Sequence, residues 1–600
     1  MKLSKQVIVY TYIVLSLLPL SINTAQTITN ENALSAFAQL RHLEYLKNKK
    51  EVEEYSKINN ISVRQILPNG GVMEMIRIEN DAPIFYITTN LGAAQTTRAN
   101  ELWPGGNLGL SITGDGYNKI GEWDGGGVLL THQELNGRVT QVDGAITLSD
   151  HSTHVAGTLI ASGIDPLAQG MAYESDLDAY DWNNDESEMA TAAINGLEVS
   201  NHSYSIGSGW FSSGSIIYWG GDVSISADED WWFGHYHNDT KLWDQIAYDA
   251  PNYLIVKSAG NDRGDHYVGG HWHYDKNKWK IATDTHPADG GLLGYDCIAI
   301  KGVAKNILTV GAVEEVLNYT SPSDVVMSSF SSWGPTDDGR IKPDLVGKGV
   351  SLKSSVATND VAYAYYSGTS MSAPNVAGTL ALLQQHYKYT HSSVPMRSAT
   401  LKGLTIHTTD EAGPAAGPDY MFGWGLMSAE RAAELISLDS YGNDIIDEQV
   451  LTDGSIYTGN INSDGTKPLR VTVCWTDPPG IPVLSNPLNN RTPMLVNDLD
   501  LKLTANSTTY YPWKLDPDNP SFAATNAGEN NVDNVEQVFI ATPTAGTYSI
   551  EVSHDGTLSG GSQAFSIIVS GHSVCYDGSL IYNTETNSFN FCEDGMWEEK

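Results

Sequence analysis

The sequence predicts an α/β fold in which a parallel sheet is flanked by helices and is followed by an antiparallel β-sandwich. In the first part of the chain, short apolar runs alternate with helical patterns, the runs at 178–182, 253–257 and 307–311 and the helices at 153–161 and 373–387. This alternation is typical of parallel strands connected by helices. With 600 residues the chain is too long for one core, so three or four units are expected.

The sandwich is predicted from a change of pattern after about residue 439. Short stretches of alternating apolar and polar residues are separated there by turn residues, at 469–475, 499–504, 537–540, 546–552 and 564–569. Such spacing indicates an antiparallel sandwich. Two insertions rich in Trp, Tyr, His, Gly and Asp, at 208–243 and 263–294, interrupt the α/β part. We expect their aromatic side chains to serve local packing more than recognition.

The composition is that of a globular protein, with 41% hydrophobic residues and a formal charge of −37 from 71 acidic and 34 basic residues. This negative charge disfavours nucleic acid and anionic membrane surfaces as partners. No stretch reaches the roughly 18 apolar residues of a membrane span, so none is predicted. We expect a monomer.

The N-terminal part differs in composition from the rest. Residues 1–25 carry two lysines, then an apolar run and small or polar residues, which predicts a secretory signal peptide and a secreted, extracellular protein. Residues 26–98 follow as a separate unit. Residues 32–58 are rich in helix-forming residues, and residues 71–88 alternate as short strands.

The chain has four cysteines: Cys297, Cys474, Cys575 and Cys592. Export makes disulfides possible, and Cys575 with Cys592 is the favoured bridge, although free thiols remain open for this pair. Cys474 lies in an apolar strand pattern and is expected to be a buried free thiol.

The motif Gly-Thr-Ser-Met-Ser-Ala-Pro places Ser370 at the start of a predicted helix. Unpaired backbone N–H groups and the positive end of the helix dipole favour developing negative charge there. A lone serine in this position is usually an N-cap. Two further motifs argue otherwise, Glu122-Trp-Asp124-Gly-Gly after a strand and His151-Ser-Thr-His-Val-Ala-Gly-Thr before a helix.

These three motifs resemble those of the subtilisin-like serine proteases, the subtilases, in the family's Asp, His, Ser order. The resemblance implies a subtilisin-like peptidase domain over 99–438 and an inhibitory propeptide over 26–98, with a permanent N-terminal domain as the alternative. Residues 439–571 resemble the C-terminal jelly-roll domain of one branch of that family. Residues 572–600 form a short appendage without an assigned role.

The resemblance also assigns roles in peptide hydrolysis. Ser370 becomes the nucleophile that forms an acyl-enzyme, because a hydroxyl activated by a base can attack a carbonyl. His151 is the general base and acid, and Asp124 orients it. The family has glycine after the histidine where this chain has Ser152, a departure that we expect the fold to tolerate.

Two further groups of residues are assigned by the same resemblance. The oxyanion hole is expected to use the Asn261 side chain and the backbone N–H of Ser370. An extended substrate is expected to pair with an exposed strand edge. The residues that form this edge and the walls of the primary pocket are Ser203, Tyr204, Ser205, Ser258, Ala259 and Gly260.

No metal or cofactor is required for this chemistry. The loop at 161–170 is too short for the family's usual calcium site, whereas the turns at 497–500 and 516–518 offer oxygen ligands for structural Ca²⁺. His235-Tyr-His237 and His271-Trp-His273 could each pair on one strand face as zinc ligands. The sequence shows no third ligand for either pair and therefore does not favour zinc.

The sequence therefore predicts a secreted serine endopeptidase that hydrolyses peptide bonds of proteins or peptides. The alternative is a catalytically inactive subtilase scaffold that acts in binding or adhesion, which would show a lost triad or oxyanion residue. An esterase of another fold would carry Gly-x-Ser-x-Gly and place its histidine last, and neither feature is present.

Overall fold

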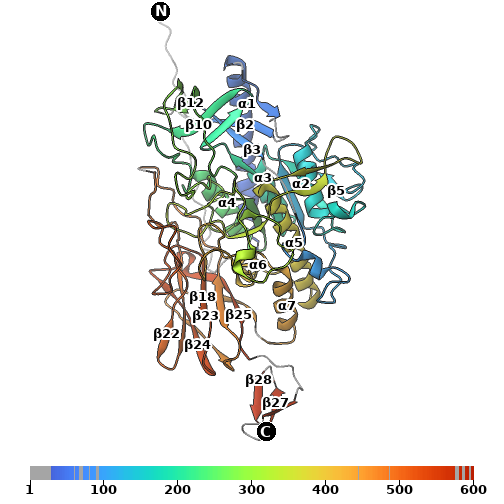
Figure 1. The fold of residues 1–600 in the computed structure, drawn as a ribbon, viewed down its shortest axis with the longest axis vertical. Helices are drawn as coiled ribbons and strands as arrows, with labels where there is room; N and C mark the ends of the chain where they lie inside the picture. The colour runs from blue at the N-terminus through green and yellow to red at the C-terminus, as the bar shows by residue number, and fades with distance from the viewer. Residues whose placement is uncertain are drawn as a thin grey trace, which may run out of the picture.

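The computed structural model describes residues 29–59, 61–66, 72–79, 82–88, 93–276, 278–443, 445–485, 487–573, 580–583, 588–593 and 596–599. The predicted signal peptide and the side chains of Cys575 and Cys592 lie outside what it describes. Figure 1 shows the α/β part in the middle, the N-terminal unit at one end and the sandwich at the other.

A seven-stranded sheet forms the centre, in the order β15-β14-β11-β7-β4-β6-β5. Every pairing within it is parallel, as predicted from the buried apolar runs. Its strands are β4 Ile120–Asp124, β5 Val139–Gln141, β6 Leu177–Asp181, β7 Val199–His202, β11 Leu254–Ser258, β14 Leu308–Val313 and β15 Leu345–Lys348.

Helices cover both faces of this sheet, which confirms the predicted α/β class. One hydrophobic cluster joins the sheet to α2, α5, α6 and α7, and a second joins it to α1, α3 and α4. Within the described residues, no helix is long and apolar enough to cross a membrane. The helices are α1 Glu31–Asn59, α2 Asp150–Ile160, α3 Asp185–Ile194, α4 Asn238–Asp249, α5 Thr369–Thr390, α6 Ser398–His407 and α7 Ala429–Asp439, with 3₁₀ turns at Ala99–Leu102, Pro166–Ala168, Pro322–Asp324 and Ser559–Gly561.

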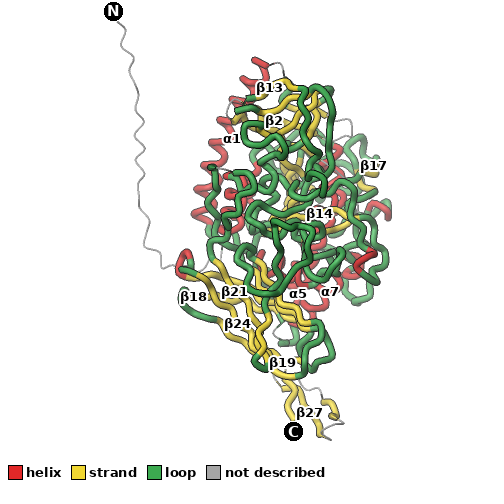
Figure 2. The backbone as a smooth tube through the Cα atoms, turned by 60° about the vertical axis from the view of Figure 1, so that its left-hand side comes forward, coloured by secondary structure: helices red, strands yellow, loops and turns green. Residues whose placement is uncertain are grey.

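The N-terminal unit consists of the long helix α1 and a small antiparallel sheet, as predicted. Its strands are β1 Arg64–Ile66, β2 Val72–Glu79 and β3 Ala82–Thr88. The sheet continues into the α/β part, because β3 pairs antiparallel with β8, Tyr204–Ile206. Figure 2 shows α1 along one side of the molecule, with the strands of this unit beside it.

The two insertions fold together into one sheet, in the order β13-β12-β10-β9. Its central pair, β10 and β12, joins one insertion to the other in parallel. The strands are β9 Trp210–Ser213, β10 Ile216–Asp222, β12 His271–Tyr274 and β13 Trp279–Ala282. A separate hairpin joins β16, Leu352–Ser355, to β17, Tyr363–Tyr366.

Two four-stranded antiparallel sheets form the C-terminal sandwich, in the orders β18-β25-β20-β23 and β19-β24-β21-β22. Apolar residues of both sheets share one core, and the jelly-roll assignment stays a prediction. The strands are β18 Ile446–Thr452, β19 Tyr457–Ser463, β20 Leu469–Cys474, β21 Asp498–Ala505, β22 Thr508–Tyr510, β23 Val535–Ile540, β24 Gly546–Asp555 and β25 Ser562–Ser570. The appendage adds β26 Leu580–Asn583, β27 Ser588–Glu593 and β28 Met596–Glu599. Cys474 is a buried free thiol, as predicted.

The sandwich is attached to the α/β part by buried contacts. Helix α6 packs on β20 and β25, and Lys305 forms a fully buried ion pair with Asp477. The Lys305 ammonium also donates to the carbonyls of Pro478 and Met494, both at 2.7 Å. Since an unpaired buried charge is strongly unfavourable, this pair ties the two units together.

Replacing Asp477 with alanine leaves the Lys305 ammonium buried without its counter-charge. We expect the Asp477→Ala variant to lose about 3–5 kcal/mol of stability in chemical denaturation. The matched control is Asp518→Ala, which removes a partner from a surface ion pair with Arg491 and should cost less than about 1 kcal/mol. Equal losses in the two variants would contradict the role of the buried pair.

Candidate active site

The register of the parallel sheet brings three strand ends to one edge. Trp123 of β4 lies opposite His202 of β7, and His202 lies opposite Lys257 of β11. The next residues along the chain therefore lie side by side across this edge of the sheet: Asp124, Ser203 and Ser258. The carboxyl ends of parallel strands are where open α/β sheets bind their ligands.

Asp124 and His151 are in direct contact. His151 lies in the first turn of α2, where the Ser149 side chain accepts the backbone N–H of Ser152 as an N-cap. The His151 Nδ1 lies 2.7 Å from Asp124 Oδ1, and both side chains are fully buried. The same oxygen accepts the Gly125 N–H at 2.6 Å and the Ser152 hydroxyl at 3.2 Å. The serine that departs from the family pattern thus adds a hydrogen bond to Asp124.

Ser370 lies in the first turn of α5, which packs against α2. Its hydroxyl donates to the carbonyl of Ser203 at 2.9 Å, and the Ser203 hydroxyl donates to the carbonyl of Ser370 at 2.5 Å. Pro374 is the sixth residue of α5 and lies inside the helix, not in its first turn as the sequence suggested. Its missing N–H leaves the Ser370 carbonyl without a helical donor, and the Ser203 hydroxyl donates to that carbonyl instead. These bonds hold the start of α5 against the row of strand ends.

Asn261 is oriented by its carbonyl oxygen. This oxygen accepts the backbone N–H of Thr369 at 2.8 Å and the Thr369 hydroxyl at 3.0 Å. Its amide nitrogen is buried and has no hydrogen-bond partner among the residues that the structure describes. A buried donor without an acceptor is unfavourable in the resting protein. Asn261 is thus held by Thr369, the residue directly before Ser370. Its free amide N–H can donate a hydrogen bond to a ligand oxygen.

The predicted substrate edge is already paired with the N-terminal unit. Thr88 of β3 lies opposite Tyr204 of β8, and Ile87 lies opposite Ser205. The Tyr204 ring contacts Trp182 and Trp243, and its hydroxyl donates to a carboxylate oxygen of α3 at 2.8 Å. Tyr204 is thus fixed by its partners and is only 1% exposed.

On the other side of the row, Ser258, Ala259 and Gly260 are buried. The Gly260 N–H donates to the Thr369 hydroxyl at 3.1 Å, and its φ of +112° is a backbone conformation that favours glycine. A Cβ on Gly260 would lie 2.6 Å from a carboxylate oxygen of Asp262. Glycine therefore suits this position because of its positive φ and the nearby Asp262 carboxylate, and its N–H joins the segment after β11 to the start of α5.

Sequence reasoning missed Glu122, which lies two residues before Asp124 on β4. Both carboxyl oxygens of Glu122 are buried, without a hydrogen-bond partner in the described part of the chain. Burial and the neighbouring Asp124 carboxylate raise the pKa of Glu122 well above its usual value. Burial therefore favours the neutral form of Glu122, which adds no second negative charge beside Asp124. An acidic residue inside a buried parallel strand is the signal that could have found it.

The predicted metal ligands separate into different arrangements. In the loop at 161–170, where the sequence predicts no calcium site, the Glu134 carboxylate accepts backbone N–H groups of Gly163, Ile164 and Asp165. The Asn497 side chain makes hydrogen bonds to Ser559 and Gln563. Calcium at the sandwich turns stays a prediction.

The two histidine pairs also differ. The Nδ1 of His237 accepts the backbone N–H of Asp239 at the start of α4, so this ring serves as a helix cap. His271 and His273 instead lie close to Asp284 and His286. Sequence reasoning missed the last two residues, although Asp284-Thr-His286 repeats the spacing of the first pair.

Comparison with known proteins identifies the α/β part. The model of the subtilase family matches residues 131–425, a range that includes His151, Asn261 and Ser370 and begins after Asp124. Residues 131–425 form a subtilase domain. The family is one of serine proteases, and the central parallel sheet with its flanking helices is the subtilase fold.

Relatives of this subtilase domain include proteases of several organisms. The chain is 24% identical over 510 residues to the serine protease/ABC transporter B family protein tagA of Dictyostelium discoideum, covering 69% of this chain and 28% of that protein. It is 47% identical over 93 residues to the C5a peptidase of Streptococcus pyogenes serotype M3, covering 16% and 8%. It is 36% identical over 148 residues to the serine protease AprX of Bacillus subtilis, covering 22% and 31%. The chain thus spans less than a third of the length of each relative.

A solved structure, that of the prenylagaramide maturation protease PagA, aligns with 56% of this chain and 98% of its own at 18% identity and a TM-score of 0.39.

The neutral state of Glu122 gives a pH-dependent prediction for the subtilase domain. A carboxyl whose folded pKa is raised contributes stability that is present below its unfolded pKa, about 4.3, and is lost as the pH rises toward the folded pKa. We expect Glu122→Gln, which keeps the shape and the neutral form, to stabilise the protein at pH 7–8. Its advantage in melting temperature should shrink as the pH falls toward about 4.

The control is Glu314→Gln at an exposed position, which should change the melting temperature little at either pH. If Glu122→Gln raised the melting temperature by the same amount at pH 4 and pH 8, the neutral form of Glu122 would not be favoured in the folded protein.

Proposed function

We propose that the protein is a secreted serine endopeptidase that hydrolyses peptide bonds through an acyl-enzyme on Ser370. The observation that carries the proposal is the buried hydrogen bond between Asp124 and His151, at the sheet edge that also holds Ser370 and Asn261. The subtilase domain supports the same reading.

In the proposed first step, Ser370 Oγ attacks the substrate carbonyl while His151 Nε2 takes the hydroxyl proton. Asp124 keeps the proton of the histidine on Nδ1 through the 2.7 Å contact, so Nε2 is available as the base. It also stabilises the imidazolium formed during attack. The additional hydrogen bond from Ser152 helps to fix the Asp124 carboxylate.

The tetrahedral intermediate carries its negative charge on the former carbonyl oxygen. The unpaired Asn261 amide N–H would donate to this oxygen, and the backbone N–H of Ser370 is the proposed second donor. His151 then gives its proton to the leaving amine, and the acyl-enzyme forms. Water, activated by His151, releases the acid product and restores the Ser370 hydroxyl.

Protein substrates are proposed to bind as an extended strand beside β8, since main-chain pairing accepts many sequences. The pairing of β3 with β8 supports this, because it is the hydrogen-bonding pattern that such a substrate would use. Thr88 lies opposite Tyr204, next to Ser203, whose carbonyl accepts from Ser370. The end of β3 therefore lies close to the proposed nucleophile.

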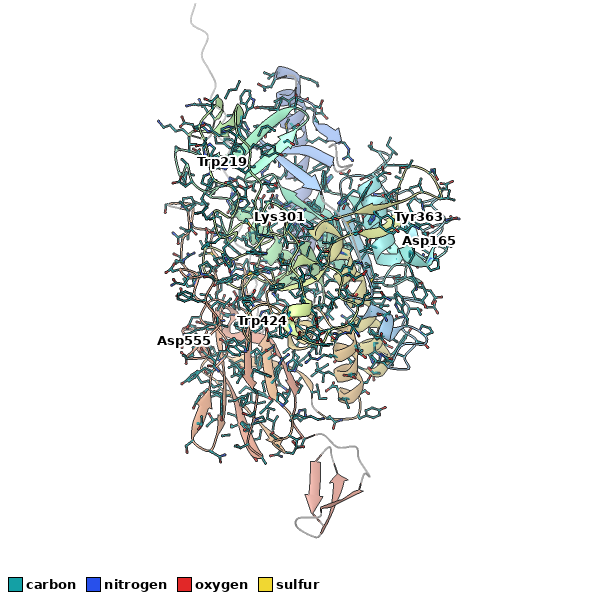
Figure 3. All side chains as sticks on the ribbon, viewed as in Figure 1. Asp165, Trp219, Lys301, Tyr363, Trp424 and Asp555 are labelled. Atoms are coloured by element: carbon teal, nitrogen blue, oxygen red, sulfur yellow. The ribbon has the colours of Figure 1, made fainter. Side chains whose placement is uncertain are left out.

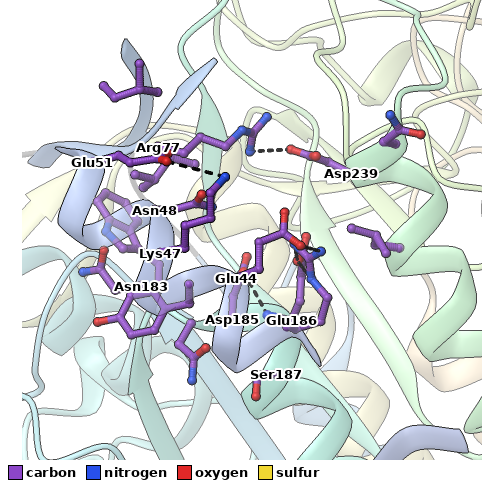
Figure 4. Close-up of a pocket in the computed structure, with 18 of the residues that line it drawn as sticks. Glu44, Lys47, Asn48, Glu51, Arg77, Asn183, Asp185, Glu186, Ser187 and Asp239 are labelled. Carbon is purple, nitrogen blue, oxygen red and sulfur yellow. Dashed lines mark hydrogen bonds and ion pairs between the residues drawn. The ribbon is translucent and has the colours of Figure 1, made fainter. Parts of the chain in front are cut away.

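We propose that residues 26–98 act as an inhibitory propeptide, which keeps substrates off β8 until it is removed. Its interface with the subtilase domain supports a removable unit, because polar groups and a pocket of about 520 Å³ lie between them. Figure 4 shows this pocket between α1, β2 and the starts of α3 and α4. Ion pairs cross it from Arg41 to Glu186 at 2.6 Å and from Arg77 to Asp239 at 2.7 Å.

A fluorophosphonate probe tests the proposed function, because it labels a serine hydroxyl that is activated by a base. After removal of the N-terminal unit, we expect labelling of the wild type and none of Ser370→Ala or His151→Ala. The His151→Ala variant separates activation from loss of the labelled atom. The control Ser367→Ala changes an exposed serine of the same segment and should be labelled fully.

The opposite outcome would support the inactive scaffold. In that case, folded wild-type protein without its N-terminal unit would neither be labelled by the probe nor cleave unfolded casein.

Loss of the Asn261 amide tests the oxyanion hole separately. We expect Asn261→Ala to lower kcat by roughly 10²–10³-fold, the loss known for the corresponding donor in subtilisin, with little change in KM. The bond forms mainly in the transition state, so binding of the ground state is spared. An unchanged kcat in steady-state assays would exclude Asn261 from the site.

The propeptide proposal predicts where the active chain begins. N-terminal sequencing of active protein should find a start between Thr88 and Gly109, because the chain changes character there and β3 ends beside Ser370. If the protein removes the segment itself, Ser370→Ala should remain uncut. Active protein that still begins at Gln26 would establish a permanent N-terminal domain.

A further inference from the structure

The sheet formed by the two insertions brings four side chains together on one side of β12. His271 and His273 alternate along β12, so both point to the same face. Asp284 and His286 follow β13 and return to that face. Trp219 of β10, labelled in the upper left of Figure 3, marks this part of the molecule.

The donor atoms of the four side chains converge. His273 Nδ1 lies 3.3 Å from His286 Nε2 and 3.4 Å from Asp284 Oδ2. Asp284 Oδ1 lies 3.5 Å from His271 Nε2, and Asp284 Oδ2 lies 3.7 Å from His286 Nε2. One ligand atom from each residue lies within 4.8 Å of all the others. The three histidines are 2–6% exposed, whereas Asp284 reaches the surface.

These separations match a tetrahedral ion. Zinc binds histidine nitrogen and carboxylate oxygen at about 2.0–2.2 Å, and two ligands at that distance in a tetrahedron lie about 3.3–3.6 Å apart. Three imidazoles and one carboxylate suit zinc, whereas calcium and magnesium take oxygen ligands. Ni²⁺ and Cu²⁺ favour square-planar or tetragonal sites instead.

Outer hydrogen bonds orient two of the rings. His271 Nδ1 lies 2.9 Å from the carbonyl of Gly269, and His286 Nδ1 lies 2.8 Å from the carbonyl of Ala227. A carbonyl only accepts, so each ring carries its proton on Nδ1 and turns the lone pair of Nε2 toward the cluster. Backbone carbonyls orient the histidine ligands of protein metal sites in the same way.

The cluster is poorly satisfied by the protein alone. The Nε2 of His271 is buried and has no hydrogen-bond partner within the described residues. It faces the Asp284 carboxylate at 3.5 Å. A lone pair facing a carboxylate is unfavourable unless a cation lies between them. The Trp219 ring stacks on His286 with centroids 3.7 Å apart, and Trp210 packs edge-on against His271 at 4.9 Å. These rings cover His271 and His286 with apolar surface.

We propose that His271, His273, Asp284 and His286 form a structural Zn²⁺ site that fixes the insertion sheet. With four protein ligands the coordination is closed, as in structural zinc sites. The site joins strand β12 to the segment after β13.

The sheet that the proposed zinc fixes follows the substrate edge along the chain and contacts the N-terminal unit. Strand β9 begins four residues after β8 ends. Phe211 of β9 packs against the apolar cluster of Val52 and Met75 in the N-terminal unit. The hydroxyl of Tyr274 on β12 donates to the carbonyl of Pro83 at 3.3 Å. Zinc at this position would therefore hold the sheet beside β8.

Metal content of the full-length protein tests the proposal. Ser370→Ala protein, exposed to zinc, desalted and measured by plasma mass spectrometry, should hold one zinc per chain. The double variant His271→Ala/His286→Ala should retain none. Replacing zinc with Co²⁺ should give the intense visible absorption of a tetrahedral site in the first protein and not in the second.

Two controls and one milder variant make the test specific. His266→Ala, on the exposed loop before β12, and His237→Ala, in the other histidine pair, should keep their zinc. Asp284→Ala removes only the surface ligand, so the fold should persist while zinc affinity, measured against a chelator, falls by more than about 100-fold. This variant keeps the proposal testable if the double variant does not fold.

A Ser370→Ala protein that holds no zinc after desalting would overturn the proposal. Zinc retained in full by the folded double variant or bound with unchanged affinity by Asp284→Ala would overturn it as well. Calcium bound in place of zinc at these residues would have the same effect. None of these outcomes depends on peptidase activity.

Discussion

The register of three parallel strands is the constraint on which the rest of the structure depends. Because β4, β7 and β11 pair in parallel, they end at one edge, where Asp124, Ser203 and Ser258 follow one another across the sheet. The starts of α2 and α5 meet this edge and bring His151 and Ser370 to it. A shift of one residue in any pairing would turn these side chains to the opposite face.

Burial of charge near this edge is controlled by neighbouring groups. The Asp124 carboxylate is fully buried, and its Oδ1 accepts three hydrogen bonds. Glu122, on the same strand, has no such partners among the described residues, and burial raises its pKa, which favours its neutral form. At the boundary with the sandwich, Lys305 and Asp477 are buried as a pair. In a low-dielectric interior, a buried charge is tolerated only where hydrogen bonds or an opposite charge compensate it.

The edge of β8 connects the subtilase domain to the two segments that surround it. Strand β3 of the N-terminal unit pairs with β8. After β8 the chain continues into β9 of the insertion sheet. Under the proposals made above, removal of the first segment would open this edge, whereas zinc in the insertion sheet would hold the second in place. The two effects would act on the same strand through different chemistry.

The sequence by itself determined the class of fold, the elements of the N-terminal unit and the strands of the sandwich, because 3.6- and 2-residue periodicities are local properties. It also predicted roles for Asp124, His151 and Ser370 from contiguous motifs, and these roles stay predictions. Contacts between distant segments could not be predicted in this way. Examples are the hydrogen bond that Ser152 adds to Asp124 and the neutral state of Glu122, which both depend on the packed environment.

The histidines of the insertions show the same division. The His271-Trp-His273 spacing places two rings on one strand face, and the sequence could predict that much. Only the tertiary structure decided that Asp284 and His286 complete the cluster while His237 caps a helix. All four donors belong to the second insertion, and they converge only because the segment after β13 returns to β12. No local pattern encodes where that segment packs.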